Sequence, residues 1–564
     1  MAESLIFSVS IQKIAGYIQT SKNKHIEYHI PMKITQTKLI LFTALFLVLF
    51  GNFAFYAHVI EVYPVSLKNI GFLISLPVVL TCFIVLLLTL VSSRFTTKPV
   101  LILLLLLSSM ASYFMNNYNV VIDYVMIQNL LQTDIHEAGD LFSLKLVFYF
   151  LLLGVLPSIF IFLVEFKPVT WKRTIITKLL SIAISVLIAF AVALPFSKSY
   201  TSFAREHTSL RYYTNPTYFI YSVGKYINQT YNSREVVVQS VGTDAQVPAT
   251  DPDRELVILV VGEATRADRL SLNGYQRETT PLLQSEDVIS FTEMYSCGTS
   301  TSYSLPCMFS IFPRKEYSSS KGESSENLLD VLQHAGVHVL WRDNNSDSKG
   351  VALRAEYQDY KNPEINPVCD SECRDIGMLV GLQEYIDEKQ EGDIFIVLHQ
   401  MGNHGPAYYK RYTKDFERYT PVCRSNQFEE CTKEEINNAY DNAILYTDYF
   451  LSQVIGLLKK NSGGFETAMV YMSDHGESLG EHNIYLHGLP YTIAPEAQTH
   501  IAAVFWLDDN FRIDKKALRD KSAELFSQDN LFHTILGLLE IETAVYDKNM
   551  DIINHENQDE RPQL

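Results

Sequence analysis

The sequence predicts a membrane-anchored α/β protein, in which an N-terminal five-helix transmembrane domain precedes an α/β domain with a mainly parallel central sheet. Five long apolar runs occur before residue 197 of the 564-residue chain. After residue 255, short apolar runs alternate with helix-like stretches, which is the pattern of a parallel sheet covered by helices. The mean hydropathy of +0.04 is high for a chain with a net charge of −17 because it averages two different halves.

Each apolar run is long enough, with its flanking residues, to cross a bilayer core of roughly 30 Å, which needs about 20 helical residues. The first run begins too late and is too long for a cleaved signal peptide, so we expect an uncleaved anchor. Buried core helices are the alternative, which five such runs in one half of the chain disfavour. The runs span residues 39–60, 70–91, 100–115, 146–164 and 179–196.

The charges between the runs predict the orientation of the chain. Lys or Arg residues precede the first run and lie between the second and third and between the fourth and fifth runs. The loop 116–142 has four acidic residues and no Lys or Arg. Because positive loops stay in the cytoplasm, we expect a multi-pass protein with a cytoplasmic N-terminus and everything after residue 197 on the far side.

Four segments follow from this division. We expect residues 1–37 to be a cytoplasmic segment, 38–197 the five-span domain, 198–254 an interfacial segment and linker, and 255–564 the α/β domain. The interfacial assignment rests on the abundance of Tyr and Phe in residues 200–231. Acidic residues outnumber basic ones by 63 to 46, which argues against a nucleic-acid partner because such proteins carry a basic surface.

The cysteines test the topology independently. Cys82 lies in the second apolar run, whereas the other six follow the last run in three close pairs. Disulfides form in oxidising compartments, which agrees with the far side of the membrane. Six cysteines allow fifteen pairings, and a zinc–thiolate cluster is the alternative, although no pair has C-x-x-C spacing. Short loops favour pairing neighbours in sequence, which are Cys297/Cys307, Cys369/Cys373 and Cys423/Cys431.

Polar clusters directly follow four of the five predicted strands, which span residues 256–261, 337–341, 394–398, 468–472 and 501–506. Ligands bind at the carboxyl ends of strands in open parallel sheets, so these clusters should converge. Glu263, Asp474 and His475 are suited to zinc or a similar divalent ion. The alternative is a helix-capping Asp beside a surface His.

The loop 297–307 contains five Ser or Thr hydroxyls between two cysteines. Hydroxyls at the start of a helix most often cap it. One of them next to a metal could instead be a nucleophile, because a metal lowers the pKa of bound water and should act on an alcohol in the same sense.

Together these motifs resemble the lipid A phosphoethanolamine transferases, which include the mobile colistin-resistance enzymes and belong to the alkaline phosphatase/sulfatase superfamily. The resemblance covers nearly the whole chain and implies an alkaline-phosphatase-like fold for the α/β domain. Five motifs carry it: Val-Gly-Glu at 261–263, Cys-Gly-Thr-Ser-Thr at 297–301, Asn-Asn-Ser-Asp-Ser-Lys-Gly at 344–350, Gly-Asn-His-Gly-Pro at 402–406 and Ser-Asp-His-Gly-Glu-Ser at 473–478.

The resemblance implies roles for individual residues. Thr301 is the expected nucleophile, and His404 and His487 are expected near the transferred group as proton carriers or as ligands of a second zinc. The implied ligands of the catalytic zinc are Glu263, Thr301, Asp474 and His475. Further implied contacts are those of the headgroup with Asn345, Ser346, Lys349 and Glu477, and those of the lipid with Asn129, Thr133 and Glu137.

The implied reaction is a two-step transfer of phosphoethanolamine from phosphatidylethanolamine to a lipid A phosphate through Thr301. It places the chain in a bacterial inner membrane, with its catalytic domain in the periplasm, acting as a monomer among membrane lipids and lowering sensitivity to polymyxins such as colistin. One alternative is a superfamily transferase or hydrolase acting on another periplasmic glycan or glycolipid, although no formylglycine-type sulfatase motif is present. The other is a catalytically inactive membrane sensor.

Overall fold

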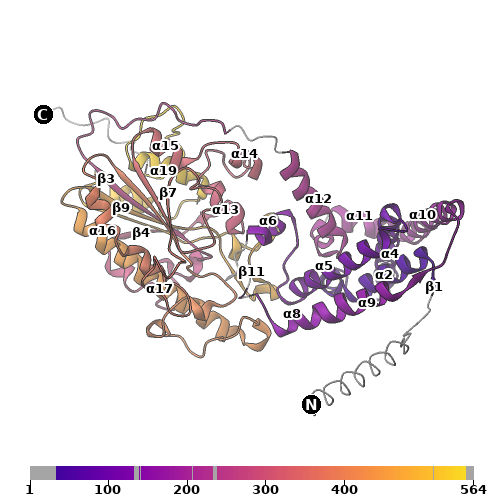
Figure 1. Ribbon diagram of the computed structural model, residues 1–564. Helices are drawn as coiled ribbons and strands as arrows, with labels where there is room; N and C mark the ends of the chain where they lie inside the picture. The colour runs from indigo at the N-terminus through magenta and orange to yellow at the C-terminus, as the bar shows by residue number, and fades with distance from the viewer. Residues whose placement is uncertain are drawn as a thin grey trace, which may run out of the picture.

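The computed structural model describes residues 33–132, 139, 141–205, 207–232, 238–511 and 513–553. Figure 1 shows an elongated group of helices at the N-terminal side and an α/β domain beside it. The membrane-anchored α/β architecture predicted from the sequence is confirmed. Thr133 and Glu137, two of the expected lipid contacts, lie outside the described residues.

Within the described ranges, four helical stretches are long and apolar enough to cross a membrane: Ile70–Val91, Thr97–Tyr118, Leu144–Leu163 and Trp171–Tyr200. A fifth crossing is present if the bent pair Gln36–Phe50 and Phe53–Val62 forms one span. The individual helices are α2 (Gln36–Phe50), α3 (Phe53–Val62), α4 (Ile70–Val91), α5 (Thr97–Asn117), α8 (Leu144–Tyr149) with a π-helical turn (Phe150–Val155) and α9 (Leu156–Leu163), and α10 (Trp171–Ala193).

The bend of 56° between α2 and α3 coincides with a buried amide network. Asn52 donates from Nδ2 to the carbonyl of Asn215 over 2.6 Å and accepts from the Asn215 backbone N–H over 2.8 Å. Asn215 Nδ2 in turn lies 2.9 Å from the Ser108 carbonyl on α5 and 2.8 Å from Ser112 Oγ. Because a helix break exposes backbone groups that lipid cannot satisfy, this network makes the break tolerable.

Short elements connect the two parts of the chain. Helices α11 (Ser197–Arg205) and α12 (Thr217–Asn232) follow the last span, with a 3₁₀ turn at Thr208–Tyr213 between them. The loop between α5 and α8 contains α6 (Tyr124–Gln132), which lies between α12 and α13 of the α/β domain (Figure 1). Tyr118 also joins the two parts, donating from its hydroxyl to the Asn426 carbonyl over 3.0 Å.

The α/β domain has a seven-stranded sheet in the order β4-β12-β9-β3-β8-β6-β7. β12 is antiparallel to both of its neighbours, and the other strands run parallel to one another. The short edge strands β4 and β7 were not predicted from the sequence. The strands are β3 (Glu255–Gly262), β4 (Val288–Phe291), β6 (His338–Asp343), β7 (Glu356–Asp359), β8 (Ile394–His399), β9 (Glu466–Ser473) and β12 (Ala503–Leu507).

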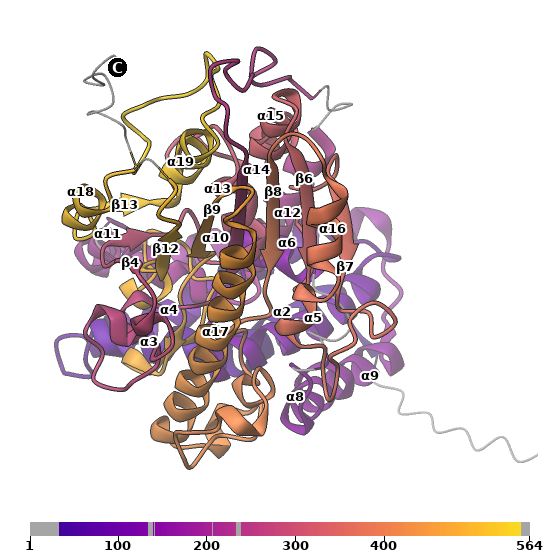
Figure 2. The same cartoon turned by 90° about the vertical axis from the view of Figure 1, so that its left-hand side faces the viewer.

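Helices cover both faces of this sheet, as the continuous apolar runs of its central strands require. Val257, Leu259 and Val261 of β3 face a core shared with α13, α15 and α19. The alternate residues of β3 face a second core, shared with α16 and α17, and Figure 2 shows α17 across the sheet on the side away from the membrane helices. The helices are α13 (Thr301–Met308), α14 (Ser319–Glu323), α15 (Leu328–His334), α16 (Leu382–Glu388), α17 (Lys433–Asn461), α18 (Lys515–Asp520) and α19 (Leu531–Leu538).

Replacing Asn215 by Ala tests the amide network at the break. The substitution removes the side-chain donor to the buried Gly51 and Ser108 carbonyls and to the Ser112 hydroxyl, and each buried hydrogen bond lost costs about 0.5–1.5 kcal/mol. We expect unfolding in detergent micelles to shift to a temperature several degrees lower. The exposed Asn549→Ala is the control, expected to change stability by less than about 0.5 kcal/mol; similar losses in both variants would contradict the proposed role of the network.

Candidate active site

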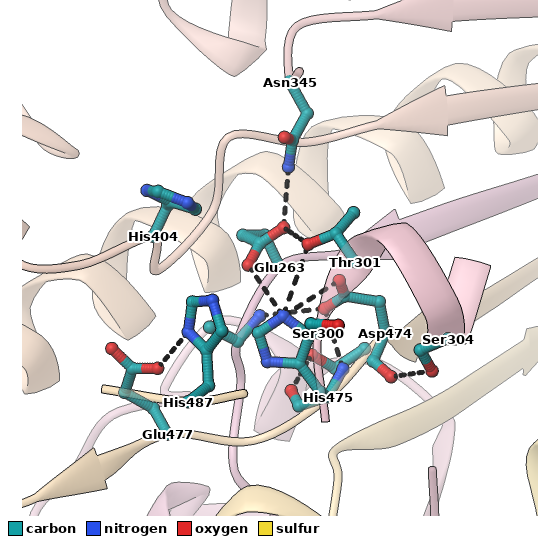
Figure 3. Close-up of polar contacts among 12 residues, drawn as sticks. Glu263, Ser300, Thr301, Ser304, Asn345, His404, Asp474, His475, Glu477 and His487 are labelled. Carbon is teal, nitrogen blue, oxygen red and sulfur yellow. Dashed lines mark hydrogen bonds and ion pairs between the residues drawn. The ribbon is translucent and has the colours of Figure 1, made fainter. Parts of the chain in front are cut away.

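Three acidic or histidine side chains meet where two neighbouring parallel strands end. Glu263 directly follows β3, and Asp474 and His475 follow β9, whose last residue pairs with Gly262. All three residues are fully buried, and one ligand atom from each lies within 4.8 Å of the others. His475 Nε2 lies 3.3 Å from Glu263 Oε1 and 3.3 Å from Asp474 Oδ2; Figure 3 shows this cluster.

The donor set fits a divalent metal ion. Glu263 Oε1 and Asp474 Oδ2 are buried and have no hydrogen-bond donor in the described part of the chain. Burial and the charge of Asp474 raise the pKa of Glu263, and His475 opposes the rise only in part. Unpaired buried carboxylates are costly unless a cation compensates them. Two carboxylates, an imidazole and a hydroxyl are the ligand types that zinc accepts.

Thr301 is the first residue of α13, and its hydroxyl faces this cluster. Thr301 Oγ1 lies 3.1 Å from Glu263 Oε2 and 3.3 Å from His475 Nε2. Ser304, one turn along α13, donates from its hydroxyl to the Asp474 carbonyl over 2.5 Å. The start of the helix is therefore attached directly to the loop that carries Asp474.

Gln528 also connects the loop that carries Asp474 to the loop that carries Thr301. Its Nε2 donates to the carbonyls of Ser473 and Asp474 over 2.8 and 2.9 Å, and its Oε1 accepts from the Cys297 backbone N–H over 2.6 Å. Sequence reasoning missed Gln528, because an isolated Gln that lies 231 residues from Cys297 and 54 from Asp474 belongs to no motif.

A second group lies beside the first. His487 Nδ1 is 2.7 Å from Glu477 Oε2, and the other oxygen of Glu477 accepts from the Tyr408 hydroxyl over 2.5 Å. Burial lowers the pKa of His487, but the Glu477 carboxylate outweighs it and the pKa is raised. The ring centroids of His475 and His487 are 4.2 Å apart, and those of His404 and His487 are 5.9 Å apart. Glu477 therefore orients His487, and Tyr408 orients Glu477.

Asn345, one of the expected headgroup residues, lies above Glu263 in Figure 3. Asn345 Nδ2 donates to Glu263 Oε2 over 2.8 Å and to the Gln400 carbonyl over 2.7 Å. Its loop is held by Asp343 at the end of β6, whose Oδ1 accepts from the Asn345 backbone N–H over 3.0 Å. Burial raises the pKa of Asp343, but His399 and the other donors outweigh this effect and bring it to about 2. Asn345 is thus a fixed support of Glu263.

Ser346, Lys349 and Asn129 are further expected contacts, and they lie nearer to the membrane helices. Lys349 Nζ donates to the Ser346 carbonyl over 2.6 Å and lies 3.4 Å from the Gln132 carbonyl at the end of α6. Asn129 is half-buried on α6. The loop that carries Ser346 and Lys349 therefore reaches the segment between the third and fourth apolar runs.

The six cysteines after the last span form three disulfides in the structure, Cys297–Cys307, Cys369–Cys373 and Cys423–Cys431. Cys82 is a buried free thiol. The bridge Cys297–Cys307 encloses the loop that contains Thr301. Asp529 lies near this bridge, but a disulfide offers no thiolate, so these three residues do not form a metal site.

Comparison with known proteins decides the family. Residues 255–541 match the Sulfatase family model, and residues 80–231 match the model for phosphoethanolamine transferase EptA/EptB. The phosphatidylethanolamine transferase Mcr-1 of Escherichia coli is 42% identical over 517 residues, which are 89% of this chain and 94% of the relative. The chain belongs to the phosphoethanolamine transferase family. Phosphoethanolamine transferase EptA of Salmonella typhimurium is 38% identical over 513 residues, 89% of this chain and 93% of the relative.

Solved structures of the family agree in fold with this phosphoethanolamine transferase. The integral membrane lipooligosaccharide phosphoethanolamine transferase A from Neisseria meningitidis has a TM-score of 0.89 at 37% identity, covering 93% of this chain and 99% of that one. The soluble domain of the same enzyme has a TM-score of 0.55 at 41% identity, covering 57% of this chain and 98% of that one. Both the family and the alkaline phosphatase/sulfatase superfamily predicted from the sequence are confirmed.

Replacing Tyr408 by Phe tests the orientation of His487. The ring keeps its packing against Phe428 and Tyr440, but the Glu477 carboxylate loses the hydrogen bond from the Tyr408 hydroxyl. A hydrogen bond to a charged acceptor is worth about 1.5–3 kcal/mol. We expect about tenfold lower kcat for phosphoethanolamine transfer at an unchanged melting temperature. The control is Tyr449→Phe, in a separate aromatic cluster with Phe416; equal activity of the two variants would contradict this role.

Proposed function

We propose that this enzyme transfers phosphoethanolamine from phosphatidylethanolamine to a phosphate of lipid A through a covalent phosphothreonine-type intermediate on Thr301. The position of the Thr301 hydroxyl, within 3.3 Å of both Glu263 and His475 at the start of α13, carries this proposal. The activities of relatives support these substrates: two are phosphatidylethanolamine transferases, and the Kdo(2)-lipid A phosphoethanolamine 7''-transferase of E. coli is 27% identical over 550 residues.

In the first step, Thr301 Oγ1 attacks the phosphorus of phosphatidylethanolamine and the bond to the diacylglycerol oxygen breaks. Glu263 Oε2, which accepts the Thr301 hydroxyl hydrogen bond, orients the nucleophile and takes its proton. His487 or His404 protonates the departing diacylglycerol oxygen, because a protonated imidazole can act as a general acid. In the second step, a lipid A phosphate oxygen attacks the same phosphorus, and the Thr301 oxygen leaves and regains a proton.

Zinc is the metal that we propose for Glu263, Thr301, Asp474 and His475. Binding a second ion is the alternative to proton transfer for His404 and His487. When bound, zinc favours loss of the hydroxyl proton and neutralises charge on the phosphoryl oxygens. The chain's own contribution is a dry, rigid cluster, because Asn345 and Gln528 fix the loops that present the ligands.

The ethanolamine headgroup is proposed to lie between the loop 345–349 and Glu477, with Asn345, Ser346 and Lys349 on one side. Asn129, Thr133 and Glu137 are proposed to contact lipid from the membrane side. Both substrates are membrane lipids, which explains why a phosphoryl-transfer domain is attached to apolar helices. We propose a bacterial inner-membrane enzyme with a cytoplasmic N-terminus, a periplasmic catalytic domain and a monomeric state. The modified lipid A gains an amine, which would weaken binding of polymyxins such as colistin.

The variant Thr301→Ala tests the nucleophile. Without the hydroxyl no covalent intermediate can form, so we expect a loss on the order of 10³-fold or more in transfer rate. Mass spectrometry of lipid A from expressing cells should show added phosphoethanolamine with the parent enzyme and none with the variant. Ser302→Ala, whose hydroxyl instead lies 3.5 Å from that of Ser300, is the control and should retain modification. An unchanged lipid A spectrum with the active parent would point to another glycan or glycolipid acceptor.

The variant Asp474→Asn tests the metal. Asparagine lacks the negative charge of the proposed Asp474 ligand and binds a cation more weakly. The zinc content of the purified variant should therefore fall well below that of the parent. Elemental analysis gives the stoichiometry, and chelation of the parent should abolish transfer until zinc is restored. Asp529→Asn is the control, since Asp529 lies beside a disulfide rather than in the cluster. Equal zinc content in all three proteins, or full activity after chelation, would reject the assignment.

A further inference from the structure

A cavity of about 690 Å³ lies between the membrane-side helices and the α/β domain. Residues of α6, the Thr208–Tyr213 turn and α12 form one side of it, and the loops 297–299 and 488–492 form the other. Helices α6, α12 and α13 lie together at this junction (Figure 1). The size suits a headgroup, because ligand pockets typically measure about 300–1,000 Å³.

This cavity shares a wall with the catalytic site. Gly298, Thr299 and Tyr303, which line it, flank Thr301 in sequence. The Gly488 backbone N–H, next to His487, donates to the Thr299 carbonyl over 2.7 Å. Thr299 Oγ1 also donates to the Leu489 carbonyl over 2.6 Å. A molecule held in the cavity would therefore lie against the loops that carry the nucleophile and His487.

Three cations line the cavity, and each lies over a tyrosine ring. The Lys225 ammonium is 3.5 Å from the ring centre of Tyr124, and the Arg314 guanidinium is 4.0 Å from that of Tyr491. Arg211 lies more loosely over Tyr212, at 5.4 Å. Among the described residues, none of the three cations forms a salt bridge. Cation–π contacts orient a charge without neutralising it, so the N–H groups stay available to an anion.

One acidic residue, Asp123, lines the cavity beside these cations. Its Oδ1 accepts the Met126 backbone N–H over 2.8 Å at the start of α6, and its charge also acts on Lys225. Near Arg314, the Asp529 carboxylate accepts the Arg314 backbone N–H. Three cations against one lining carboxylate leave the cavity positive, in a chain whose net charge is −17. Tyrosine rings also line it, offering flat faces to a sugar: Tyr124, Tyr212, Tyr218, Tyr221, Tyr303 and Tyr491.

We propose that this cavity binds a second phosphate of the acceptor lipid, the one that is not modified, together with its sugar. The inference rests on the proposed function and adds a subsite to it. The donor's one phosphate must lie at Thr301 to react, and its ethanolamine group is itself cationic, so a positive cavity does not suit it. An acceptor with two phosphates presents one to the intermediate and leaves the other for Lys225 and Arg314, as Arg and Lys recognise phosphate groups.

The test compares two acceptors with the full-length enzyme in detergent micelles containing phosphatidylethanolamine. One acceptor is a diphosphorylated glucosamine disaccharide lipid and the other is the same lipid with a single phosphate. We expect the parent to prefer the diphosphorylated lipid by at least about tenfold in kcat/KM, since one charge-assisted contact is worth about this factor. A parent that uses both acceptors equally would overturn the proposal even without any variant.

The double variant Arg314→Gln/Lys225→Gln should bring that preference close to one. Arg418→Gln is the matched control: Arg418 is a half-exposed arginine of the same domain paired with Glu278, and the preference should persist. A preference that survives the double variant would overturn the proposal. A higher KM for phosphatidylethanolamine with the preference unchanged would assign the cavity to the donor instead. Failure of the proposed function looks different, because the parent would then modify neither acceptor.

Discussion

The repulsion between two buried carboxylates governs the centre of this molecule. Glu263 and Asp474 follow adjacent parallel strands, so the register of β3 and β9 forces them together. Each presents an oxygen with no donor among the described residues, and the raised pKa of Glu263 reflects this crowding. A protein that holds two such groups in a dry interior needs a cation there, and the surrounding loops are built to keep them from moving apart.

The supporting contacts come from elements that are far apart in the sequence. Asp343 holds the turn that presents Asn345, and Asn345 holds Glu263. Gly402, with φ +47° and no side chain, allows the β8 loop to lie against the backbone of Glu263. Gln528 connects the Asp474 loop to Cys297 at the start of the loop that contains Thr301. Each of the two carboxylate groups is thus held by a partner that is itself hydrogen-bonded, which keeps the cluster in one geometry.

Sequence patterns were sufficient for the features that repeat or cluster. The apolar runs predicted the anchor, the strands predicted the parallel sheet, and polar residues after strand ends predicted that Glu263, Asp474 and His475 would converge. Features that depend on side-chain geometry were not predictable. Tyr408 and Gln528 belong to no pattern, the edge strand β7 is short and polar, and the break between α2 and α3 depends on an amide 163 residues away. Glu477 belongs to a recognisable motif, but its contacts with Tyr408 and His487 could be seen only in the folded structure.

The position of α6 has a consequence for inhibitor discovery. One side of the large cavity comes from α6 and α12, which precede the α/β domain in the chain. A truncated soluble domain would keep the carboxylate–histidine cluster but present the cavity as an open, half-lined surface. Compounds selected against such a fragment would be selected mainly for binding at the carboxylate–histidine cluster. Compounds selected against the intact chain could occupy the space between the two domains, where selectivity is easier to obtain.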